Sequence, residues 1–306
     1  VSAHPRVLHR AVAGWGRMCA MVGADTAGQA APLDAGRLRA ALRGEHGGAG
    51  ASGGPGTLWT DVRIVPSTGS TNTDLLRLAA AAAPEGLVLA TESQTAGKGR
   101  QGRVWQTRPG AALTFSVLLR PDPVPQAARG WLPLLTGVAV VHALGRVSEL
   151  EASLKWPNDV LVGQGKLAGI LAEQAAGAVV VGIGINVLGG EQDLPVASAT
   201  SLERCGAGET DRTNLLAAIL EEIEHWYLRW REAGRGDAEA AGLRKEYLSL
   251  SATVGQNVRV QLPGDRVLTG RASGVDGAGQ LLVETADADM VAVSAGDVIH
   301  VRAAGQ

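Results

Sequence analysis

The sequence predicts a mixed α/β body followed by a small β-barrel. Between Leu58 and Glu232, segments with an apolar face at helical spacing alternate with short apolar runs typical of strands. From about Ser251 the pattern changes to five short β-rich runs separated by Gly and Asp turns, which is typical of a small barrel. The chain of 306 residues is long enough for two such domains.

The region before Leu58 carries little pattern. One short helix is predicted at Pro32–Leu42, and the glycine-rich stretch His46–Gly56 has the composition of a flexible linker. We therefore divide the chain into a poorly structured N-terminal extension with its linker (1–57), the α/β domain (58–250) and the barrel (251–306).

The elements of the α/β domain follow from local pattern. Thr71 and Asp74 form a capping box, so a helix is expected to start near Thr71. Buried or amphipathic helices are predicted at Trp131–Leu144 and Asp211–Glu232; in the latter we interpret Glu221, Glu222 and Glu224 as a solvated face. Short apolar or alternating runs predict six strands: Trp59–Val65, Gly86–Ala90, Ala112–Leu119, Leu154–Val162, Gly165–Glu173 and Ala178–Val187.

The barrel region consists of short strands. Its β-rich runs are Asn257–Leu262, Val267–Val275, Gly279–Glu284, Met290–Val293 and Val298–Val301.

Composition excludes several classes of protein. The formal net charge of -2 gives no basic field, so we expect no nucleic-acid partner. The two cysteines, Cys19 and Cys205, are too few for a disulfide framework and lie in no metal-binding spacing, which is typical of a cytoplasmic protein. The longest apolar runs fall short of the ~20 residues that span a bilayer, so no membrane partner is expected.

A glycine-rich loop with G-x-G-x-x-G spacing begins at Gly97. A dinucleotide-binding fingerprint would need a helix directly after it, but Arg103–Gly110 contains Trp, Pro and Gly. Lys98, Arg100 and Arg103 between the glycines indicate a loop whose amides and cations close on an anion. Taken alone, the loop could equally be a solvated Gly/Arg segment.

Other motifs accompany the loop. They are S-T-N at Ser70–Asn72, E-S-Q-T-A-G at Glu92–Gly97, K-W-P-N-D at Lys155–Asp159, K-L-A-G-I-L at Lys166–Leu171 and G-I-G-I-N at Gly182–Asn186. In this order and spacing, from about Val65 to Val301, the series resembles the biotin–protein ligases. Lys98 departs from the family, where Arg is common at this position.

The resemblance implies a fold and a reaction. The fold is a catalytic domain related to class II aminoacyl-tRNA synthetases and lipoate ligases, with a C-terminal SH3-like barrel. The reaction uses ATP and Mg²⁺: biotin is activated as biotinyl-5′-AMP and then transferred to a lysine of a biotin carboxyl carrier domain. The carrier would belong to an acyl-CoA or pyruvate carboxylase, and the enzyme would be a monomer or a weak homodimer.

The resemblance also implies site residues. Lys166 and Arg100 would be catalytic, because negative charge gathers on the reacting phosphate and needs cations there. Biotin would contact Ser70, Thr71, Asn72, Gln94, Lys98, Gly99, Arg100, Lys166 and Gly169. ATP would contact Arg100, Arg103, Trp105, Lys155, Asn158, Asp159 and Asn186, and Asp159 would be a metal ligand.

Each role has a plainer alternative. Ser70 and Thr71 could serve only as helix caps, and Trp105 could be ordinary core. Asn158 and Asp159 could be turn residues that bond their own backbone. Lys166 could be an exposed strand lysine.

Three other functions stay open. A lipoate or octanoate ligase would use related chemistry on a related fold. A biotin-responsive DNA-binding repressor would need an N-terminal winged helix, but residues 1–57 show neither a helix-turn-helix pattern nor a basic stripe, so we expect the short form of the family. A non-catalytic binding module would not explain why Lys166 and the cationic loop occur together.

Overall fold

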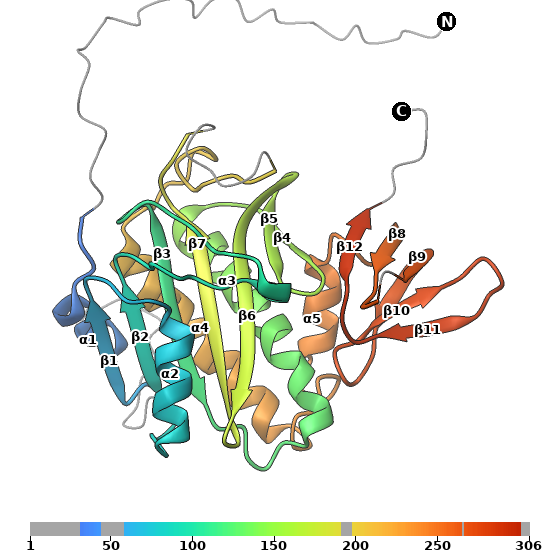
Figure 1. The fold of residues 1–306 in the computed structure, drawn as a ribbon, viewed down its shortest axis with the longest axis horizontal. Helices are drawn as coiled ribbons and strands as arrows, with labels where there is room; N and C mark the ends of the chain where they lie inside the picture. The colour runs from blue at the N-terminus through green and yellow to red at the C-terminus, as the bar shows by residue number, and fades with distance from the viewer. Residues whose placement is uncertain (1–30, 44–57, 191–197, 265, 301–306) are drawn as a thin grey trace, which may run out of the picture.

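The computed structural model describes residues 31–43, 58–190, 198–264 and 266–300. Within these ranges the chain forms a seven-stranded central sheet with helices on both faces and a five-stranded antiparallel sheet beside it (Figure 1). This arrangement confirms the predicted α/β body followed by a small β domain.

The central sheet combines strands from most of the α/β body. They are β1 (Asp61–Val65), β2 (Leu87–Thr91), β3 (Ala112–Leu119), β4 (Ala152–Lys155), β5 (Asp159–Val162), β6 (Gly165–Ala175) and β7 (Ala178–Asn186). Their order is β1-β2-β3-β7-β6-β5-β4, with β1 and β2 parallel and the other neighbours antiparallel. The prediction of a single strand at Leu154–Val162 is wrong, because the backbone of Asn158 bonds back to Lys155 and makes a turn between β4 and β5.

Helices cover both faces of this sheet. The helix α2 (Thr71–Ala80) lies on one face, in front in Figure 1, while α3 (Trp131–Ser148) and α4 (Arg212–Glu232) pack together behind the sheet. Gln126–Ser148, which includes α3, is the one helical stretch of the described residues long and apolar enough to cross a membrane, but it is mostly buried. Its apolar composition is therefore explained by its place in the core.

The cap of α2 lies one residue earlier than predicted. Ser70, not Thr71, is the N-cap, and its hydroxyl accepts from the amide of Thr73. Asp74 does not complete the expected capping box, because its carboxylate accepts a hydrogen bond from the Thr68 hydroxyl. Thr71 is thereby left free for contacts outside the helix.

The helix predicted at Pro32–Leu42 exists as α1 (Ala35–Leu42), with Asp34 as its N-cap. Leu33 and Leu38 are buried in the main hydrophobic core, and α1 packs against α4 and β1. The expectation that residues 1–57 are poorly structured is therefore wrong for residues 31–43, which belong to the α/β body. The predicted linker, like Cys19, lies outside the described residues.

The C-terminal sheet is fastened to the α/β body by tryptophans. After α5 (Leu243–Leu250), which the sequence did not predict, come β8 (Asn257–Gln261), β9 (Val267–Val275), β10 (Leu281–Glu284), β11 (Met290–Val293) and β12 (Asp297–His300). The indole of Trp131 donates to the carbonyls of Asp276 and Gly277, and that of Trp156 donates to Gly279. Both rings are almost fully buried, so the small domain is packed on the body.

The acidic residues of α4 are not a purely solvated face, which corrects the sequence interpretation. Glu224 accepts from the amide of Leu58, and Glu221 pairs with Arg146 of α3. Glu222 faces His142 of α3, whose other ring nitrogen lies 2.8 Å from a carboxylate oxygen of Glu246 on α5. A histidine between two carboxylates thus joins three helices.

These contacts make helix packing dependent on pH. Bonding to Glu222, with help from Glu246, raises the pKa of His142 above its ordinary 6.5 although burial opposes this. The contribution of His142 to stability is therefore complete below about pH 6.5 and is lost as the pH rises through the raised pKa of the folded state. We expect His142→Gln to reduce the free energy of unfolding by up to about 1 kcal/mol at pH 6 and by less at pH 9, measured by urea unfolding. An equal loss at both values would contradict this account.

Candidate active site

A cavity of about 560 Å³ lies where the glycine-rich loop, the central sheet and the C-terminal sheet meet. All of the residues that the sequence placed in a site line it: Ser70, Thr71, Asn72, Gln94, Lys98, Gly99, Arg100, Arg103, Trp105, Lys155, Asn158, Asp159, Lys166, Gly169 and Asn186. They come from segments up to 116 residues apart in the chain, from Ser70 to Asn186. The structure brings the predicted residues together, while their individual roles stay predictions.

One end of the cavity is a network of uncharged polar groups around the start of α2. Gln94 accepts from both the amide and the hydroxyl of Thr71, at 2.8 and 3.1 Å. The Ser116 hydroxyl on β3 lies 2.7 Å from the Thr71 hydroxyl and 2.6 Å from the Asn72 side-chain oxygen. Fixed donors and acceptors of this kind suit an uncharged polar head group set among apolar walls.

Asn72 is itself held from two sides. Its side-chain nitrogen donates to the carbonyl of Leu171 and to the carboxylate of Glu173, both on β6. A Cβ at Gly182 of β7 would lie 2.1 Å from the Asn72 oxygen. Only glycine leaves room there, so Gly182 allows the side chain of Asn72 to lie directly against β7.

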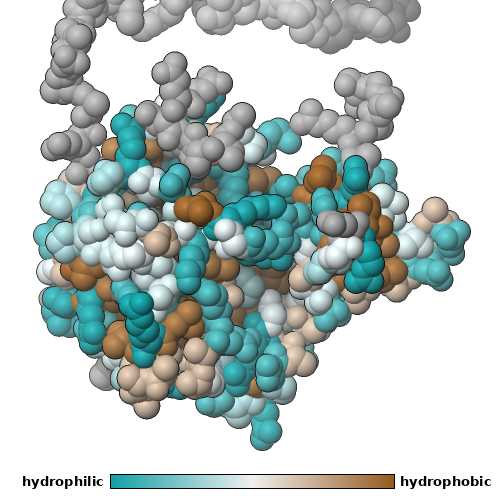
Figure 2. Space-filling model, in the orientation of Figure 1, coloured by the Kyte–Doolittle hydropathy of each residue, from teal (hydrophilic) through white to brown (hydrophobic). Residues whose placement is uncertain are grey.

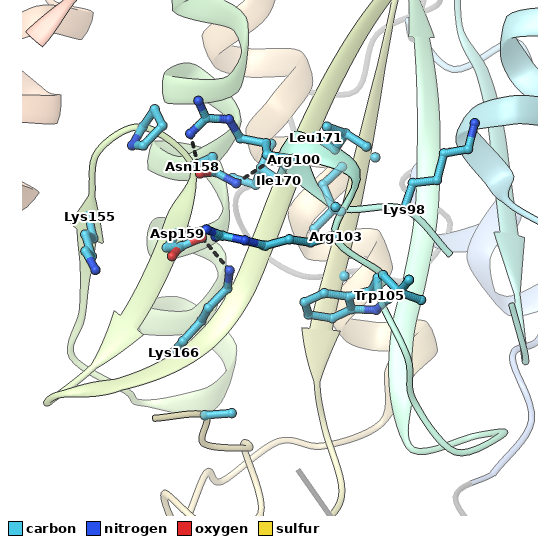
Figure 3. Close-up of a pocket in the computed structure, with 18 of the residues that line it drawn as sticks. Lys98, Arg100, Arg103, Trp105, Lys155, Asn158, Asp159, Lys166, Ile170 and Leu171 are labelled. Carbon is cyan, nitrogen blue, oxygen red and sulfur yellow. Dashed lines mark hydrogen bonds and ion pairs between the residues drawn. The ribbon is translucent and has the colours of Figure 1, made fainter. Parts of the chain in front are cut away.

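A lysine–aspartate pair lies at the middle of the cavity. Lys166 of β6 places its Nζ 2.6 Å from Oδ1 of Asp159, the first residue of β5 (Figure 3). The two side chains keep 31% and 21% of their surface exposed, so the ion pair faces the cavity rather than the core. Lys166 is therefore not simply an exposed strand lysine, because its ammonium is paired inside the cavity, while its catalytic role stays a prediction.

The glycine-rich loop brings two further cations to this pair. No α-helix follows it: Arg100–Gly102 forms a single 3-10 turn (η1), and Lys98 bridges back to Val104. Gln101 and Gly102 have left-handed backbone angles, with φ of 54° and 74°, which lets the loop reverse within three residues. The structure confirms the expectation that no helix follows the loop, which a dinucleotide-binding fingerprint would need.

Arg100 and Arg103 both reach the cavity, whereas Lys98 is exposed and points away from them (Figure 3). Arg100 donates to the side-chain oxygen of Asn158 and to the carbonyl of Gly296, and burial lowers the pKa of Arg100 although Asp297 and Asp159 oppose this. Arg103 forms an ion pair with Asp297. Positive charge is thus concentrated at the centre of the cavity.

The ring of Trp105 lies against the glycines of two strands. A Cβ added at Gly184 of β7 would lie 2.4 Å from the indole, and one at Gly169 of β6 would lie 3.3 Å from it. The indole nitrogen is buried and has no hydrogen-bond partner in the described part of the chain. Trp105 is therefore a flat apolar wall with an unused donor, beside the cations.

Sequence reasoning missed the contribution of the C-terminal domain. Gln261 of β8 and Asp297, Val298 and Ile299 of β12 also line the cavity. No local motif marks them, because their position depends on how the small domain docks on Trp131 and Trp156. The two domains therefore share one site.

A resident metal ion does not fit the described residues. They contain no group of three His, Cys, Asp or Glu side chains able to hold a metal, and the carboxylate of Asp159 is paired with Lys166. Asp159 and the side-chain oxygen of Asn186, whose amide nitrogen donates to Thr200, could complete the shell of a Mg²⁺ that arrives with phosphates.

Three kinds of surface therefore line the cavity. An uncharged polar end lies around Thr71 and Gln94, a cationic centre around Lys166 and Arg100, and an aromatic wall at Trp105. These surfaces suit a ligand that combines a polar head group, an anion and a flat ring. Hydrophilic and hydrophobic groups are mixed on the outer surface of this face, without one continuous apolar band (Figure 2).

Family profiles match both domains. The Biotin/lipoate A/B protein ligase family matches residues 64–189, and the Biotin protein ligase C terminal domain matches residues 253–301.

Several proteins of known name are similar to this chain. It is 42% identical to Biotin--[acetyl-CoA-carboxylase] ligase of Mycobacterium tuberculosis, over 81% of this chain and 92% of that one. It is 34% identical to Bifunctional ligase/repressor BirA of Bacillus subtilis, over 66% of this chain and 63% of that one. A solved structure of the Aquifex aeolicus biotin protein ligase in complex with biotin and ATP has a TM-score of 0.66 and 27% identity, and covers 80% of this chain and 100% of that one.

The contact of Trp105 with Gly184 gives a testable prediction. Gly184→Ala should displace the indole, because the added methyl group would overlap it. Overpacking of this kind typically costs about 1–3 kcal/mol of packing free energy. A loss of the same size in the binding free energy would lower the affinity for ATP roughly tenfold or more, which calorimetry measures. The control is Gly145→Ala in α3, whose added Cβ would meet nothing closer than 3.9 Å. Unchanged affinity in Gly184→Ala would show that the Trp105 wall takes no part in nucleotide binding.

Proposed function

This chain belongs to the biotin–protein ligase family, and we propose that it activates biotin with ATP and transfers the biotinyl group to a carrier lysine. One observation carries the proposal: a single cavity brings together a polar cluster, cations and an aromatic wall, the three kinds of surface that biotinyl-5′-AMP requires. The 42% identity to the Mycobacterium tuberculosis ligase over nearly all of that protein supports it.

In the first step, a carboxylate oxygen of biotin attacks the α-phosphorus of ATP. A new P–O bond forms, the bond to the β-phosphate oxygen breaks, and pyrophosphate leaves with the negative charge. The ammonium of Lys166 and the guanidinium of Arg100 would stabilise charge on the α-phosphate, because fixed cations need no reorganisation as that charge develops. The close pairing of Lys166 with Asp159 holds the ammonium in position before ATP binds.

In the second step, the amine of a carrier lysine attacks the carbonyl carbon of the mixed anhydride. The C–N bond of the amide forms, the C–O bond to AMP breaks, AMP leaves as its phosphate anion, and the amine gives up a proton to water. Arg100 and Arg103 would retain the adenylate until the carrier arrives, and the loop around them would keep water from the anhydride.

The head group of biotin would bind at the polar end. Thr71, Gln94 and the Ser116–Asn72 network offer both donors and acceptors for the ureido ring, and Gly169 lets the β6 backbone approach it. The adenine would pack on Trp105, which is one of the residues that line the cavity. Mg²⁺ bound with the ATP phosphates would neutralise part of their charge together with the cations of the cavity. Asp159 and Asn186 would lie near this Mg²⁺.

The partner we propose is a biotin carboxyl carrier domain. The relatives from Mycobacterium tuberculosis and Paracoccus denitrificans are named for acetyl-CoA carboxylase, so the same class of carrier is proposed here, with the cytoplasm as the place of reaction. We further propose a monomer or weak homodimer. The match to the Bacillus repressors gives no reason to assign repression to this chain, because it covers only 63% of their length.

Pyrophosphate release tests this function and separates it from lipoate ligation, since the matching family profile includes both kinds of ligase. The protein is mixed with ATP and Mg²⁺ in three reactions that contain biotin, lipoate or octanoate, without carrier. We expect release with biotin alone and recovery of biotinyl-AMP. Release with lipoate or octanoate instead would replace the proposed substrate, and no release from folded protein would reject the ligase.

The role of Lys166 gives a second prediction. Lys166→Ala should slow biotin-dependent pyrophosphate release by roughly 10²–10³-fold, the usual effect of losing one donor that stabilises a transition state. The fold should persist, because the side chain faces the cavity. The control is Lys245→Ala, which removes an exposed lysine of α5. Turnover of Lys166→Ala at the wild-type rate would remove Lys166 from the mechanism.

A further inference from the structure

Arg212, the first residue of α4, is the most deeply buried charged residue in the described part of the chain. Only 2% of its surface is exposed. Its Nη1 lies 2.6 Å from Oε2 of Glu92, and its Nη2 donates to the carbonyl of Ala31 at 2.8 Å. A buried guanidinium is costly unless it is paired, so these contacts hold the surrounding segments firmly in place. Neither Arg212 nor Glu92 lines the cavity.

This ion pair lies where the two ends of the segment with the glycine-rich loop come together, which we call the base of the loop. The glycine-rich loop is part of the longer segment 92–111 between two strands. Glu92 follows β2 at the start of this segment, and Ala112 begins β3 directly after its end. Arg212 binds the carboxylate of Glu92 and also donates to the carbonyl of Ala112, at 3.4 Å. The carbonyl of Glu92 accepts from the amide of Gly110 at 2.9 Å, which closes the base from the other side. One side chain thus joins both ends of the segment that carries Arg100, Arg103 and Trp105.

The segment 31–43 completes this base. The second carboxylate oxygen of Glu92 accepts from the amide of Leu33 at 2.6 Å. Beside it, the hydroxyl of Thr213 accepts from the amide of Asp34, and Arg37 bonds the side chains of Asp211 and Asn214. α1 is therefore docked on the first turn of α4, next to β1 (Figure 1).

We propose that Arg212 is a positioning residue of the active site. With Glu92 and the segment 31–43, it fixes the two ends of the loop 92–111, so that Arg100, Arg103 and Trp105 are presented to the cavity. A loop whose ends are held has fewer conformations to lose when it closes over a ligand, so the adenylate is retained more firmly. This inference rests on the proposed function only where it predicts firmer retention of the adenylate.

The chain offers a matched control at the other end of the same two elements. Arg231 lies near the C-terminal end of α4 and pairs at 2.9 Å with Glu85, which precedes β2. Arg212–Glu92 and Arg231–Glu85 therefore link α4 to opposite ends of β2. Both pairs stabilise the fold, but only the first adjoins the loop.

The test compares Arg212→Met, Glu92→Gln and Arg231→Met in the full chain. The first readout is trypsin cleavage after Lys98, Arg100 and Arg103, followed by mass spectrometry without ligands, at a temperature where urea unfolding shows each variant to be folded. We expect Arg212→Met and Glu92→Gln to speed cleavage in the loop about tenfold, because its base opens locally. Arg231→Met should leave it at the wild-type rate.

The second readout is the loss of bound biotinyl-AMP into solution during the first half-reaction. We expect the first two variants to release it several times faster than wild type, with Arg231→Met unchanged. If Arg212→Met does not fold, the nearly isosteric Glu92→Gln carries the test. Equal loop cleavage in Arg212→Met and Arg231→Met, or wild-type cleavage in Glu92→Gln, would overturn the proposal. A wild-type protein without pyrophosphate release would reject the proposed function instead, while the cleavage pattern would still decide whether Arg212 holds the loop.

Discussion

The ion pair between Lys166 and Asp159 is the interaction on which the rest of the site depends. Two or three cations in one cavity repel each other, and nearby carboxylates must balance them before a substrate anion arrives. Asp159 does this for Lys166 and Asp297 does it for Arg103, while the carbonyl of Gly296 and the side chain of Asn158 hold Arg100. The positive charge is therefore held in place with little freedom, which is the condition for electrostatic catalysis.

This arrangement also explains why the site needs both domains. The K-W-P-N-D turn, Lys155–Asp159, supplies Asp159 and Asn158 to the cavity on one side. On its other side, Trp156 is buried and bonds to Gly279 of the C-terminal domain. The same docking brings Asp297 to Arg103 of the glycine-rich loop. The small domain is thus part of the wall of the cavity, and not only a support for the body.

Local chemistry in the sequence was sufficient for much of the fold, while the motif residues of the cavity were found through the resemblance to the biotin–protein ligases. The strand at Ala112–Leu119 and the helix after Asp211 follow from apolar pattern and capping, which act within a few residues. The absence of a helix after the glycine-rich loop could also be predicted, because the Pro and Gly residues in Arg103–Gly110 exclude one. The run Leu154–Val162 was predicted as one strand, although Asn158 was also considered as a turn residue, and its bond to Lys155 shows that the turn interpretation holds there.

Features that depend on docking between distant segments could not be predicted in this way. Asp297 reaches the cavity only because the small domain packs on Trp131 and Trp156. Arg212 is an ordinary helix-start residue in the sequence, and its burial follows from Glu92 and Ala31, which lie more than a hundred residues earlier. The segment 31–43 belongs to the body for the same reason, although its own pattern is weak.

A crystal structure with a non-hydrolysable analogue of biotinyl-5′-AMP tests the central claim most directly, that one cavity binds the head group, the phosphate and the adenine together. The account predicts the ureido ring at Thr71 and Gln94, the phosphate between Lys166 and Arg100, and the adenine on Trp105. Lys166 should then contact the analogue's phosphate group. A ligand bound with its phosphate away from Lys166, or with its adenine away from Trp105, would contradict the account.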